Sequence, residues 1–167
     1  MKNKTSVNLE VSLVEIVISI LLFAIAGAIM LNSFAAARFT QIKANDKVRA
    51  GYLIQSSAEM INSFDSTNDM IEYLSTSFNY KSMSENENIF INYYDKDWNL
   101  CYEENKEYII TVKVNNVLYP YGELKNINIT SEKAYPYPFI DKNKDNTQNV
   151  IYEIYTQEFF PHIEGRW

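Results

Sequence analysis

The apolar residues of this chain are concentrated in one uninterrupted stretch near the N-terminus, VSLVEIVISILLFAIAGAIML at residues 11–31. Between Leu13 and Leu31 the only charged residue is Glu15. An α-helix rises about 1.5 Å per residue, so a helix of this length covers roughly 30 Å, the thickness of the hydrocarbon core of a bilayer. A buried helix of a soluble protein would carry a polar face, which this stretch lacks. The pattern therefore predicts that residues 11–31 form a membrane span or become buried as deeply inside an assembly.

The helical pattern continues beyond the span. Residues 32–64 contain no proline and a single glycine, Gly51. Apolar and small residues recur there at helical spacing and predict one buried face, on which Asp46 is an exception. The members of this face are Phe39, Ile42, Ala50, Leu53, Ser57, Met60, Ile61 and Phe64. We expect one long helix over residues 11–64, whose second half packs on a sheet of the same chain because it could not be stable with that face uncovered.

The period of the pattern changes in the C-terminal part. Ser66 or Thr67 can cap a short second helix that reaches Phe78, with Asp69 in its first turn and Met70, Leu74 and Phe78 on one face. Residues 79–88 are polar and suggest a loop. From Ile89 on, apolar residues alternate with polar ones and predict antiparallel strands joined by short turns, at residues 89–94, 98–103, 107–115, 124–130 and 150–160.

These elements place the chain in the α+β class. We expect a long N-terminal transmembrane helix whose second half packs on a C-terminal antiparallel sheet. The domain boundaries that follow are a leader-like polar segment at residues 1–10, the long helix at 11–64, and an exported globular head with the sheet at 65–167.

Charge is divided unevenly between the two parts. The net charge of the chain is −6. Residues 1–64 contain six Lys or Arg and four Asp or Glu, a net charge of +2, whereas residues 65–167 contain nine and seventeen, a net charge of −8. An acidic head would repel phosphates, so we expect no nucleic acid among the partners.

Candidate catalytic residues are few. His162 is the only histidine and Cys101 the only cysteine, so no intrachain disulfide can form, and no zinc cluster or Cys/His nucleophile can be assembled. We interpret Cys101 as a small buried thiol and His162 as a surface residue. The sequence predicts that the protein is not an enzyme and needs no cofactor.

One polar loop resembles part of a metal site. Asp141, Asn143 and Asp145 place oxygen ligands at alternate positions, as in the first half of a calcium loop. Asn146 stands where an EF-hand has glycine, and Lys142 and Lys144 add positive charge. The loop is either a calcium site or an ordinary solvated loop, and the lysines favour the second interpretation.

The N-terminal sequence resembles a known family. Val11-Ser12-Leu13-Val14-Glu15, followed by about twenty apolar residues, is similar to the start of mature type IV pilins and pseudopilins. The run FAIAGAIML and the later AGYLIQSSAEMI also resemble minor pilins and minor pseudopilins, so that the likeness covers residues 7–64. It implies a pilin-like fold and a minor subunit of a type IV pilus, a type II secretion-like pseudopilus or a competence pseudopilus, which acts by packing helices in a filament.

The resemblance also implies partners and a location. Other pilin or pseudopilin subunits and the lipid membrane are the expected partners, with a prepilin peptidase as a further one. The protein would cross the cytoplasmic membrane once, with its N-terminus in the cytoplasm and its head outside, and could enter a surface filament. In the family, the glutamate that corresponds to Glu15 faces the free amine of the first mature residue, here Val11, in an adjacent subunit. Glu10 departs from the family, which has glycine before the cleaved bond, so we predict slow or absent processing between Glu10 and Val11.

Two alternatives remain open at this stage. Glu15 is either a charge tolerated at the edge of the span or a group that pairs with a cation of another chain. The apolar run could instead be a signal or anchor of a secreted or membrane-tethered, adhesin-like binding domain, with Ala35-Ala36-Ala37 as a cleavage site. A run longer than the usual 7–15 apolar residues of a signal peptide argues against cleavage there.

Overall fold

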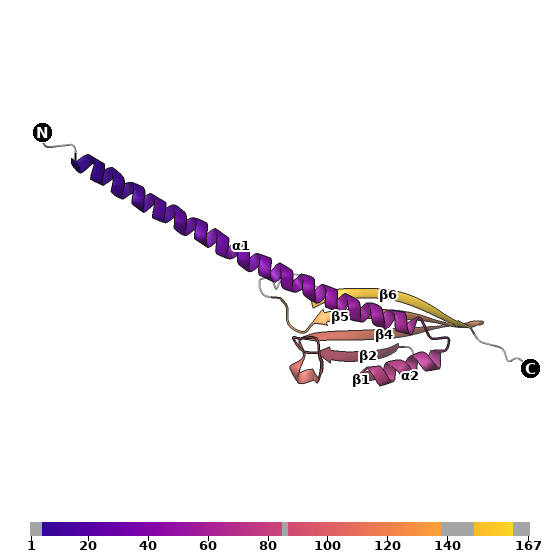
Figure 1. Cartoon of the computed structure of the whole chain (residues 1–167). Coiled ribbons are helices and arrows are strands. Elements are labelled where there is room, and N and C mark those ends of the chain that lie inside the picture. The colour runs from indigo at the N-terminus through magenta and orange to yellow at the C-terminus, as the bar shows by residue number, and fades with distance from the viewer. Residues whose placement is uncertain (1–4, 85–86, 138–148, 162–167) are drawn as a thin grey trace, which may run out of the picture. The chain divides into compact units, whose positions relative to one another are not determined.

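The computed structural model describes residues 5–84, 87–137 and 149–161, and divides the chain into two compact units, Met1–Asn45 and Asp46–Trp167. The first unit is formed by the N-terminal part of helix α1, Thr5–Ile61, and the second, here called the head, contains the rest of this helix and all other elements. Figure 1 shows the order of the elements along the chain. The long helix begins six residues before the predicted start at Val11, so the leader-like segment is largely helical.

The C-terminal end of α1 corrects a second predicted boundary. The helix ends at Ile61 instead of Phe64. The amide groups of Ser63 and Phe64 donate to the carbonyls of Met60 and Ile61 in tight turns, and the Ser63 hydroxyl also donates to the Met60 carbonyl at 2.7 Å. Serine hydroxyls compete in this way with the helical hydrogen bonds, and Asn62-Ser63 therefore ends the helix earlier than the apolar pattern indicates.

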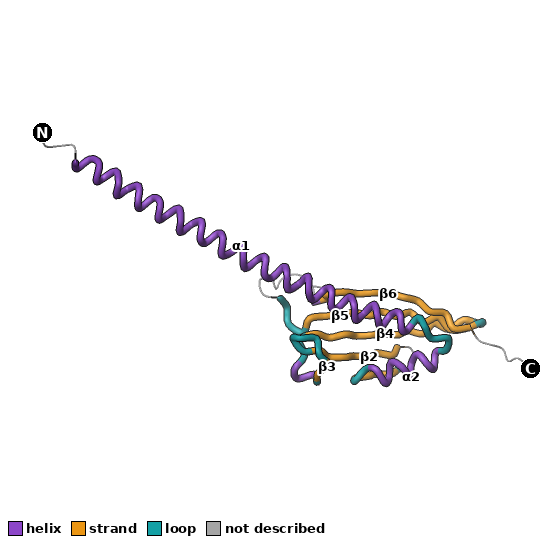
Figure 2. Tube along the Cα trace, in the orientation of Figure 1, coloured by secondary structure: helices purple, strands orange, loops and turns teal. Residues whose placement is uncertain are grey.

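The head contains an antiparallel sheet, in which the strands follow the order β1-β2-β4-β5-β6 and β3 pairs with β2 (Figure 2). The strands are β1 Tyr80–Met83, β2 Glu87–Tyr94, β3 Leu100–Cys101, β4 Tyr108–Tyr119, β5 Gly122–Lys133 and β6 Val150–Pro161. A tight turn at Pro120-Tyr121 joins β4 to β5, with Tyr119 opposite Gly122. Each neighbouring pair along the sheet is antiparallel, as the short separators in the sequence predicted.

Alternation along β4 builds the core. Tyr108, Ile110, Val112 and Val114 are buried on one face of this strand, whereas Ile109, Thr111 and Lys113 are more exposed, which confirms the predicted alternation. The buried face of the sheet, with Phe90 of β2 and Ile127 and Ile129 of β5, forms one apolar cluster with both helices. Helices α1 and α2 thus cover the same face of the sheet, and α+β is the fold class of the chain.

Helix α2, Thr67–Ser77, agrees closely with its prediction. Ser66 is the N-cap and its hydroxyl accepts the Asn68 amide at 3.2 Å, while Asp69 lies in the first turn. Met70 and Leu74 are fully buried, and Phe78 follows at the C-cap. The capping residue and the i, i+4 apolar spacing were sufficient to position this helix, because both are local properties.

Three predicted strands and a predicted loop need correction. β1 lies within residues 79–88, which were interpreted as a loop, and it pairs with β2 although it carries a polar pattern. The strand expected at 98–103 is reduced to Leu100–Cys101 and is followed by a short 3₁₀-helix, Glu103–Asn105. β4 and β5 are longer than predicted because they continue to the Pro120-Tyr121 turn, and β5 also extends at its other end to Lys133, which pairs with Tyr108.

The buried face of α1 is shifted from its predicted position. Within the head the buried residues of α1 are Asp46, Ala50, Ile54, Ala58 and Ile61. Of the predicted face, Met60 is 44% exposed, whereas Leu53 and Phe64 pack at the edge of the core. These residues follow one another in steps of four up to Ala58 and in a step of three to Ile61. The sequence pattern did not define this row because apolar residues also occur beside it.

Candidate functional site

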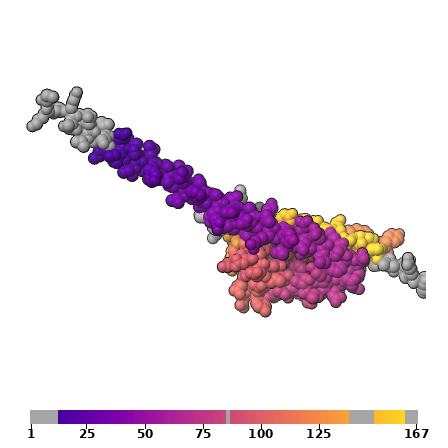
Figure 3. Space-filling view, viewed as in Figure 1, coloured from indigo at the N-terminus to yellow at the C-terminus, as the bar shows by residue number. Residues whose placement is uncertain are grey.

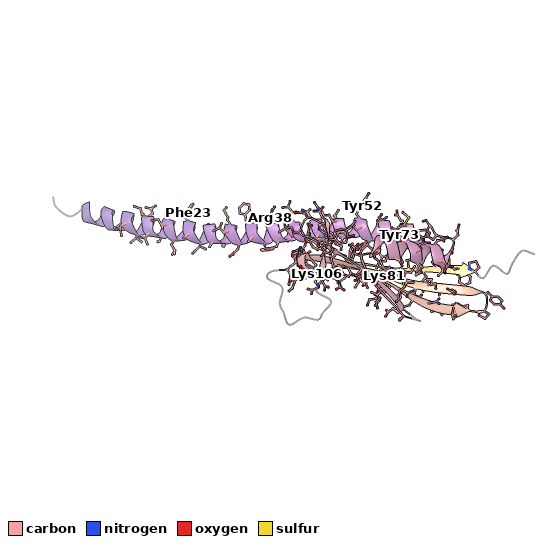
Figure 4. The ribbon with its side chains drawn as sticks, turned by 90° about the horizontal axis from the view of Figure 1, so that it is seen from below. Phe23, Arg38, Tyr52, Tyr73, Lys81 and Lys106 are labelled. Atoms are coloured by element: carbon pink, nitrogen blue, oxygen red, sulfur yellow. The ribbon has the colours of Figure 1, made fainter. Side chains whose placement is uncertain are left out.

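The apolar part of α1 is the first candidate site. In the first unit, the large apolar side chains between Leu13 and Leu31 are exposed on all sides of the helix, from 50% at Ile18 to 81% at Phe23. Figure 4 labels Phe23 on this part of α1, and Figure 3 draws the same segment in indigo. The helix is long and apolar enough to cross a membrane, with a mean hydropathy of 2.7 in its most apolar window.

Hydroxyl groups on this helix are satisfied locally. Ser19, Ser33 and Thr40 donate to the carbonyls of Glu15, Ile29 and Ala36, at 2.8, 2.9 and 3.0 Å. Backbone and side-chain donors without a partner cost several kcal/mol in hydrocarbon, and the i−4 bond removes this cost for the hydroxyls. These three side chains are therefore compatible with an apolar environment.

Glu15 is different, because its polar side chain has no hydrogen-bond or ion-pair partner within the described residues. Its side chain is exposed, and among the described residues no donor or cation contacts its carboxylate. Ser19 lies one turn away on the same face, but its hydroxyl donates to the backbone of Glu15 and not to its carboxylate. A carboxylate near the middle of a membrane costs about 2.5–3.5 kcal/mol on insertion scales, and less near the edge. A cation from another molecule would reduce this cost.

The predicted processing site lies within helical backbone. Glu10 and Val11 belong to α1, which begins at Thr5. A peptidase acts on a backbone segment that it can bind in its active site, and a helix must first open to present the bond between these residues. The helical backbone adds a conformational cost to the replacement of the family's glycine by Glu10.

The head contains a second site that sequence reasoning did not find. Asp46 of α1 is only 6% exposed, and its two carboxylate oxygens accept hydrogen bonds from Tyr108 of β4 at 2.9 Å and from Tyr137 at 2.7 Å. Tyr137 belongs to the segment that follows β5. One carboxylate therefore joins the helix to the sheet and to a connection between strands. We call Asp46, Tyr108 and Tyr137 the Asp46 cluster.

Cationic and aromatic groups surround the Asp46 cluster. The Lys133 ammonium forms an ion pair with Glu107 and lies 4.6 Å from the ring centre of Tyr108 and 5.0 Å from that of Tyr137. Trp98 stacks on Tyr108 with ring centres 4.0 Å apart. Its backbone has φ = 66°, a left-handed conformation that is unusual for a bulky residue, and the ring contact offsets part of that strain.

The electrostatics of the cluster favour neutral tyrosines. Burial, followed by the hydrogen bond to Asp46, raises the pKa of Tyr108 and the pKa of Tyr137 far above the usual value. Both hydroxyls therefore stay protonated and serve as donors. Because both carboxylate oxygens of Asp46 are already occupied, the arrangement is suited to holding three segments together and not to proton transfer.

The remaining candidate residues from the sequence are those of the calcium loop, His162 and Cys101. Asp141, Asn143 and Asp145 of the predicted calcium loop, and His162, lie outside the described residues. Within the described part of the chain, no group of three His, Cys, Asp or Glu side chains could hold a metal ion. Cys101 is a free thiol of intermediate exposure instead of a buried one, and burial, with a smaller contribution from Asp95, raises its pKa.

The signal for the Asp46 cluster was present in the sequence as a single anomaly, a carboxylate on an apolar helical face. Nothing local indicated its partners, which lie 62 and 91 residues further along the chain.

Comparison of the chain with protein-family models, with curated proteins and with solved structures gave no match.

Proposed function

We propose that the protein is a minor pilin-like or pseudopilin-like subunit that assembles with other subunits through the apolar part of α1. The observation that carries the proposal is the helical segment from Leu13 to Leu31, whose apolar side chains are exposed on all sides and whose one carboxylate, Glu15, has no partner among the described residues. The membrane can cover the apolar side chains. Only another polar group can satisfy the carboxylate.

Packing of α1 against helices of other subunits would cover its apolar side chains and would also provide a partner for the Glu15 carboxylate. Apolar helices contact one another closely in such an assembly, and a cation of one subunit can meet Glu15 of the next. A buried ion pair of this kind contributes register and partner choice more reliably than net stability. The resemblance of residues 7–64 to pilins and pseudopilins implies that this cation is the amine of the first mature residue in an adjacent subunit.

The head fits the same function. Its core is closed by α1 and α2 on one face of the sheet, and within the described residues no group of three His, Cys, Asp or Glu side chains could hold a metal ion. A folded head on an apolar helix is the general plan of a subunit that assembles through the helix and presents the head. The same plan would serve a membrane-tethered binding domain, which needs no partner for Glu15.

The test is replacement of Glu15 in the full chain in its native cells. Glu15→Ala and Glu15→Leu should leave the protein in the membrane, because removal of the charge lowers the insertion cost. Both should reduce its recovery in sheared, purified filaments by tenfold or more, as expected from about 1.4 kcal/mol per tenfold and a lost pair of at least that value. Val14→Ala, at the same depth, is the matched control and should be recovered like the wild type.

Two outcomes would contradict the proposal. If both Glu15 variants enter filaments like the wild type, the carboxylate has no assembly role. If the wild type itself is never found in filaments or in complexes with other subunits, while the membrane fraction contains the intact chain, the tethered binding domain is the better interpretation.

A further inference from the structure

Lys125 of β5 is a buried cation that has no part in the Asp46 cluster. It is 6% exposed, and its ammonium forms an ion pair with the Glu123 carboxylate of the same strand at 2.7 Å. Apolar side chains lie beside this pair. Ile127 follows Lys125 on the buried face of β5, and Phe160 of β6 lies opposite Glu123. A primary amine is therefore held next to a proton acceptor in mostly apolar surroundings.

An asparagine faces this pair from β4, the strand beside β5 in the sheet (Figure 2). Asn116 lies directly opposite Lys125, and Glu123 is opposite Leu118, the next position on the same face. Directly opposite residues of an antiparallel pair have Cβ atoms about 4.5–5.5 Å apart, and diagonal neighbours are about 7–8 Å apart. Lysine and glutamate side chains are long enough to cross these distances. The register thus places an amine, a side-chain amide and a carboxylate together on one face.

The oxygen of the Asn116 amide lacks a hydrogen bond. Its Oδ1 atom is buried and has no hydrogen-bond partner among the described residues. Buried acceptors are almost always paired in folded proteins, so an unpaired one requires an explanation. Once protonated, the Glu123 side chain could donate to Oδ1, and this bond would draw electrons from the amide carbon. That carbon would then be a better acceptor for the Lys125 amine.

We propose that Lys125 and Asn116 condense to an intramolecular isopeptide bond that links β5 to β4, with Glu123 as the proton carrier. Glu123 takes a proton from the Lys125 ammonium, and the neutral amine attacks Cγ of Asn116. The bond from Nζ to Cγ forms while the bond from Cγ to Nδ2 breaks, and Glu123 passes the proton to the leaving nitrogen. A lysine ammonium and a primary amide thus become a secondary amide and an ammonium ion, so the step needs no oxidant, reductant or cofactor.

The sheet supplies what this reaction needs beyond the three side chains. Neighbouring strands hold the amine and the amide in register before the reaction, and such orientation removes a large part of the entropy cost of a bimolecular step. Burial of the lysine keeps out water that would compete with the amine. The reaction involves only residues of the head, so it does not depend on the proposed function or on Glu15.

The test is the mass of tryptic peptides from the wild-type chain, purified in full length in detergent micelles and then unfolded. Trypsin cleaves after Lys113, Lys125 and Lys133, and gives the peptides 114–125 and 126–133 from an unlinked chain. An acylated Lys125 is not cleaved. The isopeptide bond should therefore give one peptide, 114–133, that is about 17 Da lighter than its sequence predicts because ammonia has left.

Controls separate this bond from other losses of ammonia. An asparagine that cyclises on its own backbone also loses ammonia, but trypsin would still cleave after Lys125. The protease Glu-C cleaves after Glu123 and opens the linked peptide into two chains that stay joined, as a bond between β4 and β5 requires. Asn116→Ala and Lys125→Arg should abolish the linked peptide. Asn115→Ala should retain it, because Asn115 lies opposite Asn126 on the other face of the sheet.

The role of Glu123 has a test of its own. Glu123→Gln should lower the linked fraction by about tenfold or more, since the amide cannot take the proton. Glu158→Gln is the matched control, because Glu158 lies opposite Lys125 on β6 but is exposed and should not be needed. Two wild-type peptides of unchanged mass would overturn the inference, as would a linked peptide that persists in Asn116→Ala. A Glu123→Gln chain that links like the wild type would refute the proton carrier.

Discussion

Replacement of Asp46 by alanine should weaken the head strongly, although alanine is the residue that helices ordinarily tolerate best. Its carboxylate is 6% exposed and accepts two hydroxyl donors, at 2.9 and 2.7 Å. A hydrogen bond to a charged group contributes about 1.5–3 kcal/mol, and a buried hydroxyl left without a partner costs about 1–3 kcal/mol. Part of this loss is offset because the carboxylate no longer has to be desolvated on folding. We expect Asp46→Ala to lower the free energy of unfolding by about 3 kcal/mol.

Conservative variants separate the contributions. Asp46→Asn keeps one carbonyl oxygen for one tyrosine and should cost about 1 kcal/mol. Tyr108→Phe and Tyr137→Phe each remove one donor and should cost about 1–2 kcal/mol. In the Asp46→Ala background the same tyrosine changes should cost much less, since their partner is gone. Tyr121→Phe is the matched control because Tyr121 is 81% exposed and should change little.

The assay is chemical unfolding of the full chain in detergent micelles, followed by tryptophan fluorescence. The chain has two tryptophans, so Trp167→Phe leaves Trp98 as the reporter. Trp98 stacks on Tyr108 with ring centres 4.0 Å apart and therefore responds when the cluster opens. If Asp46→Ala loses less than about 0.5 kcal/mol, or the tyrosine changes cost the same with and without Asp46, the cluster does not join these segments.

Three further predictions follow from other features. Because the pKa of Tyr108 and that of Tyr137 are raised on folding, the folded state holds these protons more tightly, and stability should be full below about pH 10 and fall above it; Tyr137→Phe should flatten this fall in alkaline melting curves. A Cβ on Gly122 would lie 2.4 Å from the Phe160 carbonyl oxygen and 2.9 Å from the Pro161 Cα, so Gly122→Ala should cost about 1–3 kcal/mol, whereas Gly51→Ala, whose Cβ would be 4.0 Å from Tyr152, should not destabilise the head. Glu10→Gly should speed processing before Val11, and mass spectrometry that finds mostly chains beginning at Val11 in the unchanged protein would refute the role given to Glu10.

Local signals in the sequence were sufficient for the elements they govern. Ser66 and the Met70–Leu74 spacing positioned α2, and the alternation around Val112 positioned the central strand with its buried face. β1 was missed because an edge strand of the sheet needs few apolar residues, and its pairing partner β2 supplies the constraint that its own sequence lacks. Strand ends at the Pro120-Tyr121 turn were also missed, since pairing extends strands beyond the residues that face the core.

The sequence could not predict which distant residues contact Asp46. The sequence marked Asp46 as an anomaly on an apolar face, and the helical period was enough for that. The period gives a direction but no distance, and nothing in the sequence around Tyr108 or Tyr137 marks either hydroxyl as a partner of Asp46. Only the packing of α1 on β4 brings the two hydroxyls to one carboxylate.

Asp46 and Glu15 are two carboxylates of helix α1 that differ in whether the described residues provide them with hydrogen-bond donors. Asp46 is costly to bury, and the head provides it with two donors, so this part of the chain is complete in itself. Glu15 is costly in an apolar environment as well, and the described residues provide it with none. Under the proposed function Glu15 finds its partner on another chain, whereas a solitary tether would leave its carboxylate unpaired.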